Sequence, residues 1–223
     1  MSTPTLTPAR RRASSPREEI RAHLALLAGQ PGPGELLELR FRFQTGGMAR
    51  RFYPAHQPAG MVEAIHRLGS RCDVYVGCAP RTRRSGGRDA VERAWVLWAE
   101  CDSLAARAAV KRFTPAPTLV IASGSPHGRH AYWALTDPAN ADTLEHGNRR
   151  LAHALGADPV CVDAARILRP LSVARLVRGR LVPAPSFADA SVAEARRARR
   201  GRAAPSVRFA RRALGARRLS GAR

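Results

Sequence analysis

The stretch Trp95-Val96-Leu97-Trp98-Ala99-Glu100-Cys101-Asp102 is an apolar run that ends in two carboxylates separated by one residue. Charged residues lie before and after the run, a pattern that predicts a buried β-strand. Because side chains alternate between the two faces of a strand, Glu100 and Asp102 project from the same face. Two anions held this close repel each other unless a cation lies between them. The stretch therefore points to a divalent metal at the end of a strand.

The same two carboxylates also have a structural interpretation. Acidic residues that follow a strand often cap the next helix, and residues 103–110 have a helical pattern. Carboxylate oxygens suit Mg²⁺ and Mn²⁺, but they are common without any ion. The pair alone leaves both interpretations open.

The chain has 223 residues, which is enough for one sizeable core or for two small lobes. We find no apolar stretch long enough to cross a membrane and no apolar leader after the N-terminus, so we expect a cytoplasmic protein without membrane contact. The four cysteines, Cys72, Cys78, Cys101 and Cys161, show no close pairing. We therefore expect reduced thiols and no disulfide framework.

The formal net charge is +21, and residues 171–223 alone contain 14 arginines and two acidic residues. Such a segment can bind nucleic acid through phosphate neutralisation, without sequence preference. Since Lys111 is the only lysine, a GC-rich coding bias is an alternative origin of the arginines. Residues 1–17 are rich in Ser, Thr, Pro and Arg, which predicts a disordered N-terminal arm.

Between these two tails, residues 18–170 are predicted to form one domain. Alternating residues predict a half-buried strand at 37–44. Its apolar face carries Leu37, Leu39, Phe41 and Phe43, and its polar face carries Glu38, Arg40, Arg42 and Gln44. Strands and helices alternate and hairpins occur, so the predicted class is α+β. The other predicted strands are 50–53, 73–77, 118–122 and 130–135; the predicted helices are 18–27, 61–68, 103–110 and one capped by Asp137-Pro138 that runs through Leu155.

Basic side chains gather in a glycine-containing loop at residues 80–88. A solvated connection between two strands is one interpretation of this loop. The other is an anion-binding loop, because flexible glycines with flanking arginines permit close approach to phosphates. The candidate nucleic-acid contacts are Arg81, Arg83, Arg84 and Arg88.

Two further segments carry candidate chemistry: Ser123 with His130, and Asp163 with Arg166 and Arg169. Each segment alone also has a structural explanation. Together with Glu100 and Asp102 they match the requirements of phosphoryl transfer, in which carboxylates hold metal ions against a triphosphate while polar and cationic groups bind its oxygens.

The order and spacing of these segments resemble the catalytic core of the archaeo-eukaryotic primase superfamily, in its branch of primase-polymerases encoded by plasmids, phages and integrated elements. The resemblance covers about residues 37–170. It is carried by Asp73-Val74-Tyr75-Val76-Gly77 with Pro80-Arg81, by Trp98-Ala99-Glu100-Cys101-Asp102, by Ser123-Gly124-Ser125 through His130-Ala131-Tyr132-Trp133, and by Asp163-Ala164-Ala165-Arg166-Ile167-Leu168-Arg169-Pro170.

The resemblance implies a two-lobed core with mixed sheets and a central cleft. It makes Glu100, Asp102 and Asp163 the catalytic metal ligands, with Mg²⁺ or Mn²⁺ as the cofactor. His130 and Ser123 would contact the incoming nucleotide, and Arg166 and Arg169 are candidates for the triphosphate or the template backbone. The family pair is usually Asp-x-Asp, and the longer Glu100 favours Mn²⁺ over Mg²⁺, which demands near-ideal octahedral geometry.

The function implied by the resemblance is that of a DNA primase-polymerase, a nucleotidyltransferase for replication of a mobile element by a two-metal mechanism. Its partners would be a single-stranded DNA template and nucleoside triphosphates. A helicase would be encoded separately, because the sequence contains no Gly-x-x-x-x-Gly-Lys-Ser/Thr loop. The alternative is a weakened or inactive remnant that binds single-stranded nucleic acid through its basic charge.

The resemblance ends after Pro170, where relatives tend to continue with a Pro-Gly-Thr-x-Asn-like stretch and this chain continues with Leu171-Ser172-Val173. Residues 171–223 form an Arg-rich low-complexity tail, and a shifted reading frame or a degraded end would explain it as well as a polycationic arm.

Two rival interpretations fit the sequence less well. A rolling-circle nicking enzyme would place two histidines on one strand face, but His127 and His130 are three positions apart. A zinc site from Cys72, Cys78, His127 and His130 lacks the usual ligand spacing.

Overall fold

The computed structural model describes residues 15–43, 46–171, 175–177 and 180–182. Helices and strands alternate with hairpins, which confirms the predicted α+β class. The helices are α1 (Pro16–Ala28), α2 (Ala59–Leu68), the 3₁₀ helix η1 (Arg88–Ala90), α3 (Leu104–Arg112) and α4 (Ala141–Leu155). The strands are β1 (Leu36–Arg42), β2 (Met48–Pro54), β3 (Asp73–Gly77), β4 (Arg93–Cys101), β5 (Leu119–Ala122), β6 (Arg129–Asn140), β7 (Ile167–Leu168), β8 (Arg175–Val177) and β9 (Arg180–Val182).

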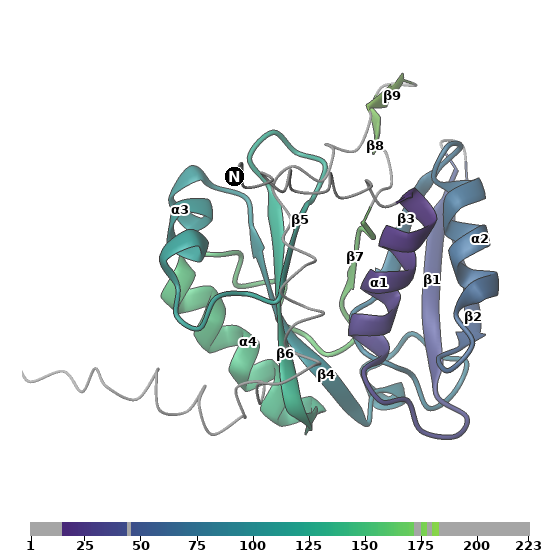
Figure 1. Cartoon of the computed structure of the whole chain (residues 1–223), viewed down its shortest axis with the longest axis horizontal. Coiled ribbons are helices and arrows are strands. Elements are labelled where there is room, and N and C mark those ends of the chain that lie inside the picture. Colours follow the sequence, from purple (N-terminus) through teal and green to yellow (C-terminus); the bar gives the residue numbers. More distant parts are fainter. Residues whose placement is uncertain (1–14, 44–45, 172–174, 178–179, 183–223) are drawn as a thin grey trace, which may run out of the picture.

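Two larger sheets form two lobes. One has the strand order β2-β1-β3-β7 and the other β4-β6-β5, while β8 and β9 make a separate hairpin. Figure 1 shows α1 and α2 with the first sheet on the right, and α3 and α4 with the second sheet on the left. Every pairing between the named strands is antiparallel. We expected mixed sheets, with both parallel and antiparallel pairs, and this expectation is wrong for the described strands.

Helix α1 joins the two lobes. Its N-terminus is closed by a capping box between Ser15 and Glu18, with Pro16 in the first turn. The helix thus begins two residues before the predicted start. Its apolar face buries Ile20, Leu24 and Leu27 completely, and the helix packs against both α2 and β4.

One residue on the polar face of β1 is buried, contrary to the prediction from its alternation. Leu37, Leu39 and Phe41 face the core as expected, whereas Phe43, just after β1, is 46% exposed. On the polar face Glu38 is fully buried, while Arg42 is exposed. The Glu38 carboxylate accepts hydrogen bonds from the equally buried Arg81, at 2.8 and 3.0 Å. Arg81 further donates to the carbonyls of Ala164 and Ala165, which ties the first sheet to the segment before β7.

Strand β4 is buried over most of its length, as its continuous apolar run predicts. Helix α4 covers one face, and Gly147 permits this close packing because a Cβ there would lie 2.9 Å from Leu97 Cδ2. The cap of α4 is not the predicted Asp137-Pro138, since β6 continues through these two residues. Asn140 caps the helix through its side chain, which accepts from Thr143 N.

The helix after β4 is capped by Ser103, whose Oγ accepts a hydrogen bond from Ala106 N. Asp102 is therefore not needed as a cap. This removes the structural interpretation of the Glu100-x-Asp102 pair that the sequence left open.

Both predicted tails lie mainly outside the described residues. Of residues 1–17 the structure describes 15–17, where α1 begins, and of residues 171–223 it describes Leu171 and the two strands of the β8–β9 hairpin. The two predicted domain boundaries, after residues 17 and 170, stay predictions. In the part of the chain that the structure describes, no helix is both long enough and apolar enough to span a membrane.

We expect Arg81→Met to destabilise the fold by about 3 kcal/mol, because it removes the fully buried partner of Glu38 Oε2 and leaves the carbonyls of Ala164 and Ala165 without their donor. Urea unfolding followed by circular dichroism measures this change. The matched control is Arg84→Met at an exposed position, which should change stability by less than about 0.5 kcal/mol. Equal effects of the two substitutions would contradict a structural role for the buried ion pair.

Candidate active site

The pairing of β4 with β6 places Glu100 directly opposite His130, and Trp98 opposite Tyr132. Paired residues share a face of the sheet, so all four side chains project from the face opposite Leu97, which packs on α4. His130 is only 2% exposed. Its Nε2 lies 3.4 Å from Glu100 Oε1. The histidine thus orients one oxygen of the acid.

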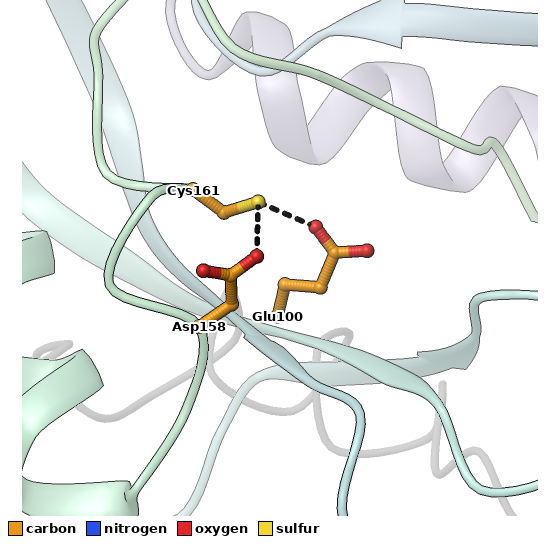
Figure 2. Close-up of side chains that lie close together, drawn as sticks. All are labelled: Glu100, Asp158 and Cys161. Carbon is orange, nitrogen blue, oxygen red and sulfur yellow. Dashed lines mark hydrogen bonds between the residues drawn. The ribbon is translucent and has the colours of Figure 1, made fainter.

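The other oxygen of Glu100 meets a thiol from a distant part of the chain. Cys161 Sγ lies 2.7 Å from Glu100 Oε2 and 3.3 Å from Asp158 Oδ2. Figure 2 shows the sulfur between the two carboxylates. Glu100, Asp158 and Cys161, hereafter the acid–thiol group, each offer one ligand atom, and these atoms lie within 4.8 Å of one another.

Two backbone contacts hold the acid–thiol group together. Asp158 N donates to the carbonyl of Glu100 at 2.9 Å. Trp98 Nε1 donates to the carbonyl of Cys161, also at 2.9 Å. Since Trp98 is fully buried, the segment that follows α4 is fixed on β4 next to Glu100.

The pKa values of the two paired acids are shifted in opposite directions. The pKa of Glu100 is lowered to about 2, mainly by the hydrogen bond with His130 and further by that with Cys161, against the effect of burial. The pKa of Asp102 is raised by burial and by the negative charge of Glu100. Burial and Glu100 also raise the pKa of the Cys161 thiol. A divalent cation would relieve this repulsion.

A serine loop lies beside Asp102. A Cβ on Gly128 would lie 2.8 Å from Asp102 Oδ1 and would overlap the hydroxyls of Ser123 and Ser125. Ser125 Oγ accepts from Gly128 N at 2.9 Å, and Ser123 N donates to the Gly128 carbonyl. The glycine therefore lets a carboxylate and two hydroxyls approach one another closely.

No protein-family model matches this chain, and no curated protein matches it. Solved structures do. The archaeo-eukaryotic primase (AEP) domain of the primase-polymerase from cyanophage S-2L aligns with a TM-score of 0.55 and 16% identity, covering 74% of this chain and 86% of that one. The chain has the archaeo-eukaryotic primase fold.

Two structures of primase RepB′ agree. The primase aligns with a TM-score of 0.52 and 19% identity, over 76% of this chain and 59% of that one. The RepB′ catalytic domain in complex with initiator DNA aligns with a TM-score of 0.53 and 20% identity, over 75% and 88% of the two chains. The resemblance seen in the sequence motifs is thus confirmed at the level of the fold.

The primase fold brings some of the predicted site residues together and leaves others apart. Glu100, Asp102, Ser123 and His130 all lie around the ends of β4, β5 and β6. Asp163 lies outside the acid–thiol group and pairs with Arg166 at 2.6 Å. The positive charge of Arg166 also acts on Glu100 and on Cys161, so this pair lies near the acid–thiol group. Arg169 pairs with Asp73 at 2.8 Å and stacks on Tyr75.

The sequence missed Asp158, Cys161 and Ser125. Asp158 and Cys161 lie in the irregular segment between α4 and β7, where no periodic pattern marks a functional residue. Ser125 is in the quoted Ser123-Gly124-Ser125 stretch, and its position two residues after Ser123 was the available signal. The zinc set of Cys72, Cys78, His127 and His130 is not among the groups that the described residues form.

The basic loop is only partly available to a nucleic acid. The prediction for Arg81 is wrong, because its fully buried guanidinium donates to Glu38 and to backbone carbonyls. Arg83 pairs with Asp89, and Arg88 pairs with Asp142 and Glu145, but both side chains stay half exposed. Arg84 is exposed. The loop precedes β4, whose start at Arg93 lies about 23 Å along the strand from Glu100.

A second buried histidine, His23 of α1, lies near the candidate site. His23 is fully buried, contacts the ring of Tyr132 edge-on, and accepts a hydrogen bond from Leu171 N at its Nδ1. Its pKa is lowered to about 3 by burial and by the neighbouring His130. His23 is thus neutral in the folded protein at neutral pH, whereas the unfolded chain binds a proton below about pH 6.5.

This difference predicts acid sensitivity. Because the unfolded state binds more protons between about pH 6.5 and 3, stability falls as the pH falls through this window. We expect His23→Gln, which can still accept from Leu171 N, to reduce the loss measured at pH 5 by about 2 kcal/mol. Urea unfolding at pH 7 and pH 5 measures it, with His66→Gln at an exposed position of α2 as the control. An unchanged pH dependence in His23→Gln would contradict the assignment.

Proposed function

We propose that this chain is a primase-polymerase, a nucleotidyltransferase that copies a single-stranded DNA template for replication of a mobile element. The observation that carries the proposal is the convergence of Glu100, Asp158 and Asp102 beside His130, on a fold shared with primase-polymerase domains. Carboxylates that cluster around one point are what a metal-dependent phosphoryl transfer requires.

The donor set fits a divalent cation. Glu100 and Asp158 offer oxygens within 4.8 Å of each other. Asp102, whose pKa is raised by burial and by the charge of Glu100, adds a third carboxylate. We assign the catalytic Mg²⁺ or Mn²⁺ to Glu100, Asp102 and Asp158. The bound ions would activate the attacking hydroxyl and stabilise the pyrophosphate leaving group.

We propose Asp158 as the third carboxylate ligand of the metal, in place of the predicted Asp163. The Asp163 carboxylate is 46% exposed and is neutralised by Arg166, so it has a cation already. Asp158 points at the sulfur that also contacts Glu100. The surrounding residues then take distinct roles: His130 orients Glu100, and the hydroxyls of Ser123 and Ser125 are available to donate to a nucleotide phosphate.

The template contacts in our proposal come from the exposed arginines Arg83, Arg84 and Arg88. Half-exposed guanidinium groups suit phosphate contacts without base specificity. Support comes from the similar RepB′ catalytic domain, which was solved with initiator DNA. A nucleoside triphosphate is the second substrate, and a helicase encoded elsewhere would supply the unwound strand.

The alternative function is that of an inactive remnant that binds single-stranded nucleic acid, and it is favoured by the net charge of +21. Primer extension by the purified full chain in Mn²⁺ separates the two. The proposed function predicts extension, whereas the remnant predicts DNA binding alone.

Asp102→Ala should reduce nucleotide incorporation by about 100-fold or more, since loss of a metal ligand costs several kcal/mol of transition-state stabilisation. Single-stranded DNA binding should be nearly unchanged. Primer extension and fluorescence anisotropy measure the two quantities, and Asp137→Ala, an exposed acid on β6, serves as the control. Activity within about tenfold of the parent would remove Asp102 from the mechanism.

Asp158 and Asp163 give a second, paired test. We expect Asp158→Asn to lower incorporation by about 100-fold and Asp163→Asn by less than about tenfold, because only the first side chain belongs to the acid–thiol group. Both substitutions remove one charge and preserve size. The reverse order of effects in the same primer-extension assay would return the role of third ligand to Asp163.

A further inference from the structure

A cysteine lies where an all-oxygen metal site would have none. Cys161 is the one thiol, among the residues that the structure describes, that belongs to the acid–thiol group. Mg²⁺ takes oxygen ligands in near-ideal octahedral geometry. A thiolate is instead a ligand for softer ions such as Zn²⁺, Co²⁺ and Cd²⁺, which also accept carboxylate oxygens.

We propose that Glu100, Asp158 and Cys161 form a binding site for a thiophilic divalent ion of the zinc class, with Cys161 Sγ as the thiolate ligand. Three protein ligands with an open position are the arrangement of many zinc sites that bind a further group. Binding displaces the thiol proton to solvent.

Hydrogen bonds to β4 hold the two ligands from the segment after α4 in place. The backbone at Asp158 and at Cys161 is tied to β4 by hydrogen bonds of 2.9 Å, through Asp158 N and the Cys161 carbonyl. Only three positions separate the two residues, so both ligands come from one short segment.

His130 supplies a second, independent indication. Its 2% exposed ring aims Nε2 at Glu100 Oε1, and this leaves Oε2 facing the sulfur. In many metal sites a residue that does not itself bind the ion holds a ligating carboxylate in one orientation by a hydrogen bond.

The inference extends the proposed function and rests on it in one respect, because Glu100 and Asp158 are also the proposed ligands of the catalytic ion. Zn²⁺ at the acid–thiol group therefore competes with Mg²⁺ or Mn²⁺ and inhibits nucleotide incorporation. The preference for softer ions comes from Cys161 alone, and removal of the sulfur should abolish it while the carboxylates remain.

Titration of the metal-stripped full chain with Co²⁺ is the direct test. A thiolate bound to Co²⁺ gives a sulfur-to-metal charge-transfer band in the near ultraviolet, which carboxylate ligands do not produce. We expect one Co²⁺ per chain with this band in the parent protein and in Cys72→Ser, whose sulfur donates to Leu68 O away from the site. Cys161→Ser should lose the band, and a band that is absent from the parent or survives in Cys161→Ser overturns the proposal.

Two further measurements keep the test decisive. Asp158→Asn should retain the band but weaken Co²⁺ binding by about tenfold or more, and unchanged affinity would overturn the ligand set even if Cys161→Ser did not fold.

In Mn²⁺-supported primer extension, the Zn²⁺ concentration that halves activity should be at least about tenfold higher for Cys161→Ser than for the parent. Equal inhibition would overturn the competition at Glu100. If the parent protein shows the charge-transfer band but no primer extension, the proposed function is contradicted while the metal site is supported.

Discussion

The antiparallel register between β4 and β6 is the constraint on which the candidate site depends. It sets Glu100 opposite His130 and Trp98 opposite Tyr132. A slip of one residue would turn every side chain of β4 to the other face and would bury Glu100 against α4. The register is held because Trp98 and Tyr132 are fully buried on one face and Leu97 packs on Gly147 on the other. The apolar strand therefore fixes the position of the acid.

The second half of the site comes from a segment without regular structure. Residues between α4 and β7 cross from the second sheet to the first. Trp98 and Arg81 both donate hydrogen bonds to carbonyls of this segment, at Cys161 and at Ala164. This crossing brings Asp158 and Cys161 to Glu100 and gives the site a mixed set of oxygen and sulfur ligands. A buried ion pair between Glu38 and Arg81 thus supports the site from the other lobe, although neither residue lies in it.

The sequence predicted the part of this arrangement that follows from local pattern. The apolar run gave the buried strand, and period-two spacing placed Glu100 and Asp102 at its end. Arg81 was predicted wrongly, because an arginine in a glycine-containing loop looks solvated unless its buried partner is known, and Glu38 looked like the polar face of a strand. Asp158 and Cys161 were missed for a related reason. Their role depends on contacts with residues about 60 positions away, which single-sequence patterns do not encode.

The central claim is that Glu100 and Asp158 together hold the catalytic ion. Anomalous scattering from crystals grown with Mn²⁺ and a nucleoside triphosphate measures it most directly, because the ion is located independently of any assay. The account predicts a manganese peak bound by both carboxylates, with Asp102 close by. A peak at Asp163, or no peak at Glu100, would contradict it.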